Sequence, residues 1–283
     1  MGTKGLMLER TLVKRFEDNL REEEKSRATI EKYVRDVKDF MRFTGEGSII
    51  KKDTVISYKQ HLIKEHAISS TNSMLAAVNC FLRFAGYPGY AVRAFRVQKA
   101  VFRAREQELS REEYIRLVEA AGKKGDRRLS LLMQTICATG IRISELPFIT
   151  VESADSRRAA VTLKGKTRTV IIPTELCKKL KCYAEENKIK SGSIFVTRSG
   201  RPMDRSNVLH AMKALCDDAG VEKCKAFPHN LRHLFAVTYY DAEKDVVHLA
   251  DLLGHSNINT TRIYTLVSCE TMEQQVEALG LVL

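Results

Sequence analysis

The chain has 283 residues, 44% of them hydrophobic, which is enough for two domains with ordinary apolar cores. Its formal net charge of +12 favours a polyanionic partner, because clustered cations gain affinity by releasing counterions from a phosphate backbone. No apolar run approaches the ~18 residues of a membrane-spanning helix, and no signal-like segment opens the chain. We therefore expect a globular cytoplasmic protein, associated with the nucleoid if it binds DNA, and no membrane partner.

The cysteines are odd in number and scattered along the chain, with no Cys-x-x-Cys pair. This usage fits reduced thiols in the cytosol better than a disulfide framework or a zinc ribbon. We expect no metal and no cofactor. The seven cysteines are Cys80, Cys137, Cys177, Cys182, Cys216, Cys224 and Cys269.

Residues 8–85 carry apolar side chains at helical spacing, which predicts a small helical bundle. The clearest pattern runs through Ile30, Val34 and Met41, behind Ser26 as a candidate helix cap. We assign residues 1–95 to a helical N-terminal domain.

A basic stretch follows, and it contains no aspartate or glutamate between His66 and Arg105. A charge run is commonly a solvated face, but the lack of acids and the interleaved aromatic residues favour a segment that lies along DNA phosphates. Residues 96–108 form the expected linker, which would let two domains close around a duplex as a clamp. The candidate DNA-binding cations here are Arg83, Arg93, Arg96, Lys99, Arg103 and Arg105.

The second domain, residues 109–283, opens with a capping box at Ser110. Residues 129–138 are almost wholly apolar and predict a buried helix that stops at Gly140. Residues 158–163 and 168–172 predict a β-hairpin with a turn at 164–167. Lys166 and Arg168 of this hairpin are further candidate DNA-binding cations. The expected fold is mainly α with a small antiparallel β-sheet in the second domain.

The C-terminal region holds the most distinctive pattern, which begins at Pro228-His-Asn-Leu-Arg-His233. His229 and Arg232 are three residues apart in a predicted helix, so both project from one face. His255 follows a glycine that ends the apolar helix at residues 245–253. Tyr264 comes nine residues later, in a short segment with Thr260 or Thr261 as the expected helix cap.

These patterns, together with Thr139-Gly-Ile-Arg-Ile-Ser-Glu-Leu146, resemble the tyrosine recombinases of the Xer and phage integrase family, in their simple two-domain form. The resemblance implies a core-binding, SAM-like DNA-binding domain before the linker and a catalytic domain after it. It further implies that DNA strands are cleaved and rejoined through a 3′-phosphotyrosine intermediate, for integration, excision, inversion or dimer resolution.

The resemblance also assigns roles to residues. Tyr264 would be the nucleophile, Lys164 would protonate the departing 5′ oxygen, and His229 and His255 would act as phosphate donors or proton carriers. The guanidinium groups of Arg142 and Arg232 would bind the non-bridging phosphate oxygens. Partners would be double-stranded DNA, three further protomers in a tetramer on two duplexes with the C-terminal tail docked in trans, and an optional accessory directionality protein.

Other interpretations stay open at this stage. Arg142 beside Glu145 is also the pattern of a structural ion pair, and Lys166 lies two residues from Lys164. His229 and His233 have the spacing of a helical zinc pair, although no glutamate lies between them. Two alternative functions are a type IB topoisomerase-like nicking and closing enzyme and a non-catalytic DNA-binding regulator.

Overall fold

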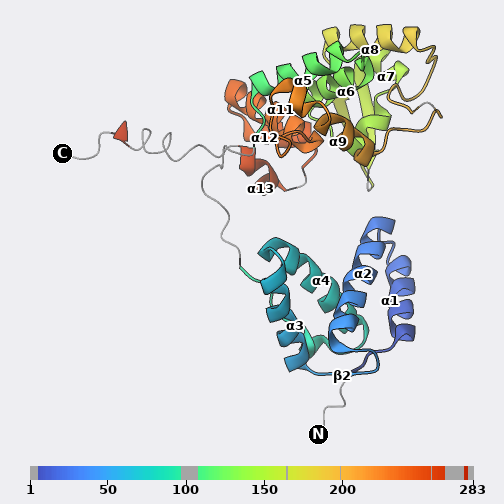
Figure 1. The fold of residues 1–283 in the computed structure, drawn as a ribbon, viewed down its shortest axis with the longest axis vertical. Coiled ribbons are helices and arrows are strands. Elements are labelled where there is room, and N and C mark those ends of the chain that lie inside the picture. Colours follow the sequence, from blue (N-terminus) through green and yellow to red (C-terminus); the bar gives the residue numbers. More distant parts are fainter. Residues whose placement is uncertain are drawn as a thin grey trace. The chain divides into compact units, whose positions relative to one another are not determined.

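The computed structural model describes residues 6–96, 108–163, 165–197, 199–255, 257–264 and 277–279. The chain divides into two compact units, Met1–Lys99 and Ala100–Leu283, and each is described by itself (Figure 1). Both units are mainly helical, and the second contains a small antiparallel sheet, which confirms the expected fold class. Lys99, Arg103, Arg105, Lys164 and most of the predicted C-terminal tail lie outside the described residues.

The first unit is a helical bundle whose helices bury one apolar face each. Phe16 and Phe81 meet in the core with ring centroids 5.4 Å apart. Ser26 begins the second helix as predicted, and its side chain accepts a hydrogen bond from the Thr29 N–H at 3.3 Å. The elements are β1 (Leu6–Met7), α1 (Arg10–Glu22), α2 (Arg27–Thr44), β2 (Ile49–Ile50), α3 (Lys52–Glu65), α4 (Ile68–Phe84) and the 3₁₀ helix η1 (Pro88–Tyr90), with β1 paired antiparallel to β2.

The second unit begins with the predicted capping box, in which Ser110 and Glu113 bond each other's backbone N–H groups. Its first elements are α5 (Arg111–Lys123), α6 (Arg127–Thr139), the 3₁₀ helix η3 (Ile143–Phe148), α7 (Val151–Ser156), β3 (Arg158–Leu163), β4 (Lys166–Ile171) and α8 (Thr174–Glu186). The remaining elements are α9 (Arg205–Lys213), α10 (Cys216–Ala219), α11 (Pro228–Glu243), α12 (Val246–Leu253), α13 (Ile258–Thr261) and the 3₁₀ helix η4 (Arg262–Tyr264). None of the helices among the described residues combines the length and the hydropathy needed to cross a bilayer.

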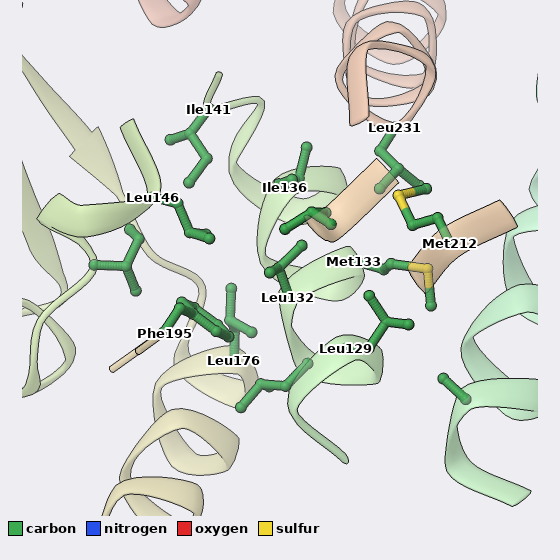
Figure 2. Packing of buried hydrophobic residues seen from close by; sticks show 14 of the residues in the cluster. Leu129, Leu132, Met133, Ile136, Ile141, Leu146, Leu176, Phe195, Met212 and Leu231 are labelled. Carbon is green, nitrogen blue, oxygen red and sulfur yellow. The ribbon is translucent and has the colours of Figure 1, made fainter. Parts of the chain in front are cut away.

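Helix α6 lies at the centre of the core of this unit, as its apolar sequence predicted. Leu132 and Ile136 of α6 are fully buried, and side chains from α8, α9 and α11 surround them (Figure 2). The helix ends at Gly140, which has a φ of +63°. A Cβ atom at Gly140 would lie 2.4 Å from the Phe235 ring of α11. The glycine therefore permits both the left-handed turn and the close approach of α11 to the segment that carries Arg142.

The hairpin is tighter than the sequence predicted. Strand β4 begins at Lys166, not at Arg168, and the register runs from Arg158↔Ile171 to Leu163↔Lys166. The expected turn residue Thr167 pairs with Thr162 across the strands, with their hydroxyl oxygens 2.9 Å apart. Threonine packs well on a pleated surface, and this pair extends the ladder toward the tip. Only residues 164 and 165 then connect the strands, and Gly165 has a φ of +72°.

Candidate active site

Arg232 is the buried centre of the site. Pro228 occupies the first turn of α11, where its missing N–H costs no hydrogen bond, and Arg232 follows one turn later with 2% exposure. Its guanidinium donates to the carbonyl oxygens of Gly140 at 2.6 Å and Leu253 at 2.8 Å. These carbonyls lie at the C-terminal ends of α6 and α12, which carry partial negative charge. Burial and the charge of Arg142 lower the pKa of Arg232 to about 10, so the group stays charged at neutral pH.

Glu145 holds the neighbouring arginines in place. Its carboxylate is 2% exposed and accepts hydrogen bonds from Arg142 Nη1 at 3.0 Å and from Arg168 Nη2 at 2.7 Å. It also accepts one from the backbone N–H of Arg142 at 2.7 Å, and it lies 3.9 Å from Arg232 Nη1. Burial alone would raise the pKa of this carboxyl, but the backbone N–H and the two guanidiniums lower it below its ordinary value. Three guanidiniums are thus arranged around one buried anion.

Arg142 and Arg232 meet at a shared acceptor. Arg142 Nη1 lies 3.4 Å from the Leu253 carbonyl oxygen that also binds Arg232. The Arg142 side chain is 41% exposed, however, and it lines a cleft of about 490 Å³ together with Arg205, His229 and Arg232. The cleft therefore presents cations from the residue that precedes η3, from α9 and from α11 to whatever enters it.

His229 and His255 supply imidazoles on two sides of Arg232. His229 is exposed at the rim of the cleft, and partial burial of its ring, with the charges of Arg232 and Arg142, lowers its pKa. His255 lies between two polar partners, Arg232 Nη2 at 2.9 Å from Nε2 and Thr261 Oγ1 at 2.8 Å from Nδ1. Burial and the nearby arginines lower the pKa of His255 to about 4. Both rings are therefore neutral at pH 7.

Tyr264 lies in an apolar pocket and does not line the cleft. The residue is 2% exposed and packs with Leu249 and Leu253 of α12. The ring of His255 stacks over it, with centroids 6.2 Å apart and an interplanar angle of 14°. The ring of His233 contacts its edge at 5.1 Å. The phenol is thus buried beside His255 and close enough to Arg232 to act on its charge.

The segment that carries Tyr264 begins differently from the prediction. Asn257 caps α13, and its side chain accepts a hydrogen bond from the Asn259 N–H at 2.9 Å. The expectation that Thr260 or Thr261 is the cap was wrong. An asparagine side chain satisfies the free N–H groups of a helix start as well as threonine does, and here it lies one turn earlier. The hydroxyl of Thr261 is thereby available for His255.

The basic residues of the hairpin have different surroundings. Arg168 is only 14% exposed, and its guanidinium donates to Glu145 and to the carbonyl oxygen of Leu252. A Cβ atom at Gly254 would lie 2.4 Å from Arg168 Cδ, so the glycine makes room for this side chain. This position argues against the DNA contact expected of Arg168 and makes it a brace between the hairpin and α12. Lys166 belongs to β4, and Lys164 lies outside the described residues.

Three of the other DNA-binding candidates, Arg83, Arg93 and Arg96, are exposed on the first unit. His233, which was considered with His229 as a zinc pair, lies 3.7 Å from Glu108, and its ring contacts the edge of Tyr264. Over the described parts of the chain, no group of three His, Cys, Asp or Glu side chains could hold a metal ion.

Two residues at the site were missed by the sequence analysis. Arg205 is the first residue of α9, after the cap Asp204, and it lines the cleft. Nothing in the local sequence distinguishes this arginine from the other surface arginines. Thr261 was considered only as a cap. Its contact with His255 arises from the turn between α12 and α13, which sequence spacing alone does not reveal.

Comparisons with known proteins all give one family. The family described as "Phage integrase family" matches residues 107–270, and "Phage integrase, N-terminal SAM-like domain" matches residues 13–86. A relative named tyrosine recombinase XerA, from Thermococcus kodakarensis, is 30% identical over 281 residues, which cover 96% of each chain. A tyrosine recombinase XerH from Campylobacter jejuni is 35% identical over 167 residues, which cover 56% of this chain and 47% of the relative.

Solved structures give the same fold. A crystal structure of XerA recombinase is 26% identical, covers 95% of this chain and 97% of the other, and has a TM-score of 0.52. A crystal structure of a lambda integrase (75–356) dimer bound to a COC′ core site is 18% identical, covers 92% and 95% of the two chains, and has a TM-score of 0.74. A lambda integrase tetramer bound to a Holliday junction has a TM-score of 0.73 at 18% identity, with 93% and 78% of the two chains covered.

Proposed function

Since the chain belongs to the phage integrase family, as a tyrosine-type site-specific recombinase, we propose that it cleaves and rejoins DNA strands through a covalent 3′-phosphotyrosine bond to Tyr264. The bond energy of the broken phosphodiester is kept in that intermediate, so the reaction requires neither ATP nor a metal. The crossover reaction would be an integration, excision, inversion or dimer resolution.

The main observation behind this proposal is the pair of guanidiniums at Leu253. Arg142 and Arg232 share its carbonyl oxygen, at 3.4 Å and 2.8 Å, and both line the cationic cleft. Two guanidinium forks side by side can bind the two non-bridging oxygens of one phosphate, which a pair of lysines would not do with fixed geometry. Because the groups are held by Glu145 before DNA arrives, they need no reorganisation as charge develops in the transition state.

The proposed cleavage step exchanges one bond to phosphorus for another. The phenol oxygen of Tyr264 forms a bond to phosphorus as the bond from phosphorus to the 5′ oxygen breaks. Lys164 gives a proton to that leaving 5′ oxygen, and His229 and His255 bind phosphate oxygens or carry the proton of the phenol. Both imidazoles are neutral at pH 7, which leaves each with one donor and one acceptor nitrogen. Rejoining is the same sequence in reverse with a new 5′ hydroxyl.

Cleavage also requires that Tyr264 leave its pocket. The phenol is 2% exposed and does not line the cleft, so the segment of α13 and η4 must shift before the phenol oxygen can lie in line with the scissile bond. We propose that DNA binding and protomer assembly supply this shift. The DNA-free protein would then hold its nucleophile back until a synapse forms.

The proposed assembly is a tetramer on two duplexes, as in the lambda integrase tetramer bound to a Holliday junction. Residues 1–95 would form the core-binding domain, residues 96–108 the linker, and residues 109–283 the catalytic domain, whose tail docks on a neighbour. The two domains would close on the duplex as a clamp, with the linker cations on phosphates. An accessory protein would set the direction of exchange where one is needed.

The test begins with DNA recovered from a genomic library by Tyr264→Phe protein, which should bind without cutting. That site is then built into a nicked suicide duplex, which traps the covalent intermediate. We expect the wild-type protein to form an adduct that resists denaturation and the Tyr264→Phe protein to form none. Binding without adducts would instead show a DNA-binding regulator. Adducts without recombinant products would show a nicking and closing enzyme.

A further inference from the structure

A buried threonine contacts the ring of His255 from the side opposite Arg232. The Thr261 residue is fully buried in α13, and its Oγ1 atom lies 2.8 Å from Nδ1 of His255. It belongs to the segment that carries the nucleophile, three residues before Tyr264. A threonine hydroxyl in a buried site normally has a partner, so the contact alone does not distinguish a functional role from ordinary satisfaction of a polar group.

The chemistry of the two neighbours of His255 settles which ring nitrogen carries the proton. Arg232 can only donate, so Nε2 of His255, at 2.9 Å from Arg232 Nη2, must accept. A neutral imidazole has one N–H, which therefore lies on Nδ1 and donates to the Thr261 hydroxyl. The strongly lowered pKa of His255 keeps the ring in this neutral form.

We propose that Thr261 is a positioning residue, whose hydroxyl fixes both the orientation and the tautomer of His255 so that Nε2 faces the arginine pair. This inference rests on the proposed function, because it assigns the ring a task in strand cleavage. Nε2 is then the nitrogen that can take the proton of the phenol, and Nδ1 is kept out of the reaction. Without the hydroxyl, the Nδ1–H group would be buried beside a carbon atom, and the ring would gain by turning away.

The same contact joins His255 to the movement of Tyr264. The ring of His255 stacks on Tyr264, while its Nδ1 atom is bonded to the helix that precedes Tyr264. A shift of α13 that keeps the hydrogen bond carries the imidazole with it. Thr261 therefore also links the segment that carries Tyr264 to the imidazole that accepts from Arg232.

Three variants separate this role from simple packing. Thr261→Val keeps the shape and β-branching but removes the hydroxyl, and Thr261→Ser keeps the hydroxyl but removes a methyl group. The rate of adduct formation on the nicked duplex should fall about 10- to 100-fold in Thr261→Val, as expected for a misplaced reacting group, and should be nearly restored in Thr261→Ser. In a His255→Ala background, Thr261→Val should change the rate by less than about twofold, because the residue acts through the imidazole.

A second measurement does not depend on activity. Ring ¹⁵N shifts of His255 in the DNA-free protein should show a protonated Nδ1 and a bare Nε2, and Thr261→Val should alter that pattern while the melting temperature shows that the protein still folds. A Thr261→Val protein with wild-type shifts and a wild-type rate overturns the inference, as does a Thr261→Ser protein that is equally damaged. Failure of the wild-type protein to form adducts would refute the proposed function instead, and the ring shifts would still test the role of Thr261.

Discussion

The two halves of the site differ in how far they are prepared for reaction. The half around Arg232 is built in full, since Glu145, two helix ends and His255 fix its guanidinium in a buried position. The half around Tyr264 is not, because the phenol packs among apolar side chains and does not reach the cleft. The difference teaches that the cationic part of the site is already ordered in the DNA-free protein, whereas the proposed nucleophile is still buried there.

The sharpest test compares the two arginines of the prepared half. Arg232→Ala removes a charge that is 2% exposed and takes the donor away from the carbonyl oxygens of Gly140 and Leu253, so the free energy of unfolding should fall by about 1–3 kcal/mol. Arg142→Ala removes a group that is 41% exposed, and stability should fall by less than about 1 kcal/mol. Both should lose cleavage by about 10²–10³-fold or more. Denaturant titration with the suicide duplex assay checks both, and equal stability of the two variants would contradict the comparison.

The other half is tested at the nucleophile itself. Tyr264→Ala should cost about 3 kcal/mol of stability, because it empties an apolar pocket beside Leu249 and Leu253. Tyr264→Phe keeps the ring and should stay within about 1 kcal/mol of the wild type while losing all adduct formation. Thermal melts of the two variants supply the measurement. If Tyr264→Ala were as stable as the wild type, the phenol would not be packed in solution, and no release step would be needed.

Gly254 connects the two halves and offers a matched pair of substitutions. Gly254→Ala places a Cβ atom 2.4 Å from Arg168 Cδ at a φ of +63°, whereas Gly220→Ala meets nothing within 4 Å at a φ of +59°. The backbone strain of about 1–2 kcal/mol is common to both, so the difference in melting temperature reports the clash alone. We expect only Gly254→Ala to slow cleavage as well, because Arg168 braces Glu145 and His255 follows the glycine. Similar behaviour of the two variants would show that Arg168 adapts freely.

The lowered pKa values of the two imidazoles bear on how the rate of adduct formation depends on pH on the acid side. A group that works in its neutral form loses activity as the pH falls through its pKa, and the pKa of His255 is about 4. The pKa of His229 is also below its ordinary value. If His255 is the imidazole whose neutral form limits the rate, adduct formation at pH 5.5 should stay within about twofold of that at pH 7.5, whereas an imidazole of ordinary pKa near 6.5 would lose about tenfold. A rate that falls steeply below pH 6.5 would mean that the site is more open than its packing indicates.

The smallest expected effect lies away from the site, on the exposed cations. Arg96→Ala should weaken DNA binding and lower the slope of log affinity against log salt by about 0.9, if the residue contacts a phosphate as its acid-free surroundings suggest. Lys178→Ala on α8, whose ammonium bonds Glu175 at 2.7 Å, is the control that should leave the slope unchanged. Binding isotherms at several salt concentrations decide between them. An unchanged slope for Arg96→Ala would assign the basic stretch to solvation.

Features that depend on neighbouring residues in the sequence were predicted well. The caps at Ser26 and Ser110, the stop at Gly140 and the buried helix α6 were all predicted, because each depends on residues within one or two turns of helix. The arginine and histidine positions of the site came from the resemblance of their local motifs to those of the family.

What failed or was missed depends on contacts between distant segments. Arg168 looked like any surface cation of a hairpin, and only the approach of α12 shows that it lies against Leu252 and Glu145. Thr261 looked like a cap, although Asn257 already fills that role. No local pattern reveals that Tyr264 is buried, since that is decided by how α11, α12 and η4 meet.

The two carbonyl oxygens that bind Arg232 affect how the sequences of related proteins should be interpreted. A related protein that has lost strand exchange but keeps the fold would still need a guanidinium to join the ends of α6 and α12. The presence of that arginine therefore says little about whether such a protein is an active enzyme. Arg142 is 41% exposed, and we expect the fold to tolerate its loss, so it is the more informative position for recognising from sequence a family member that has lost strand exchange.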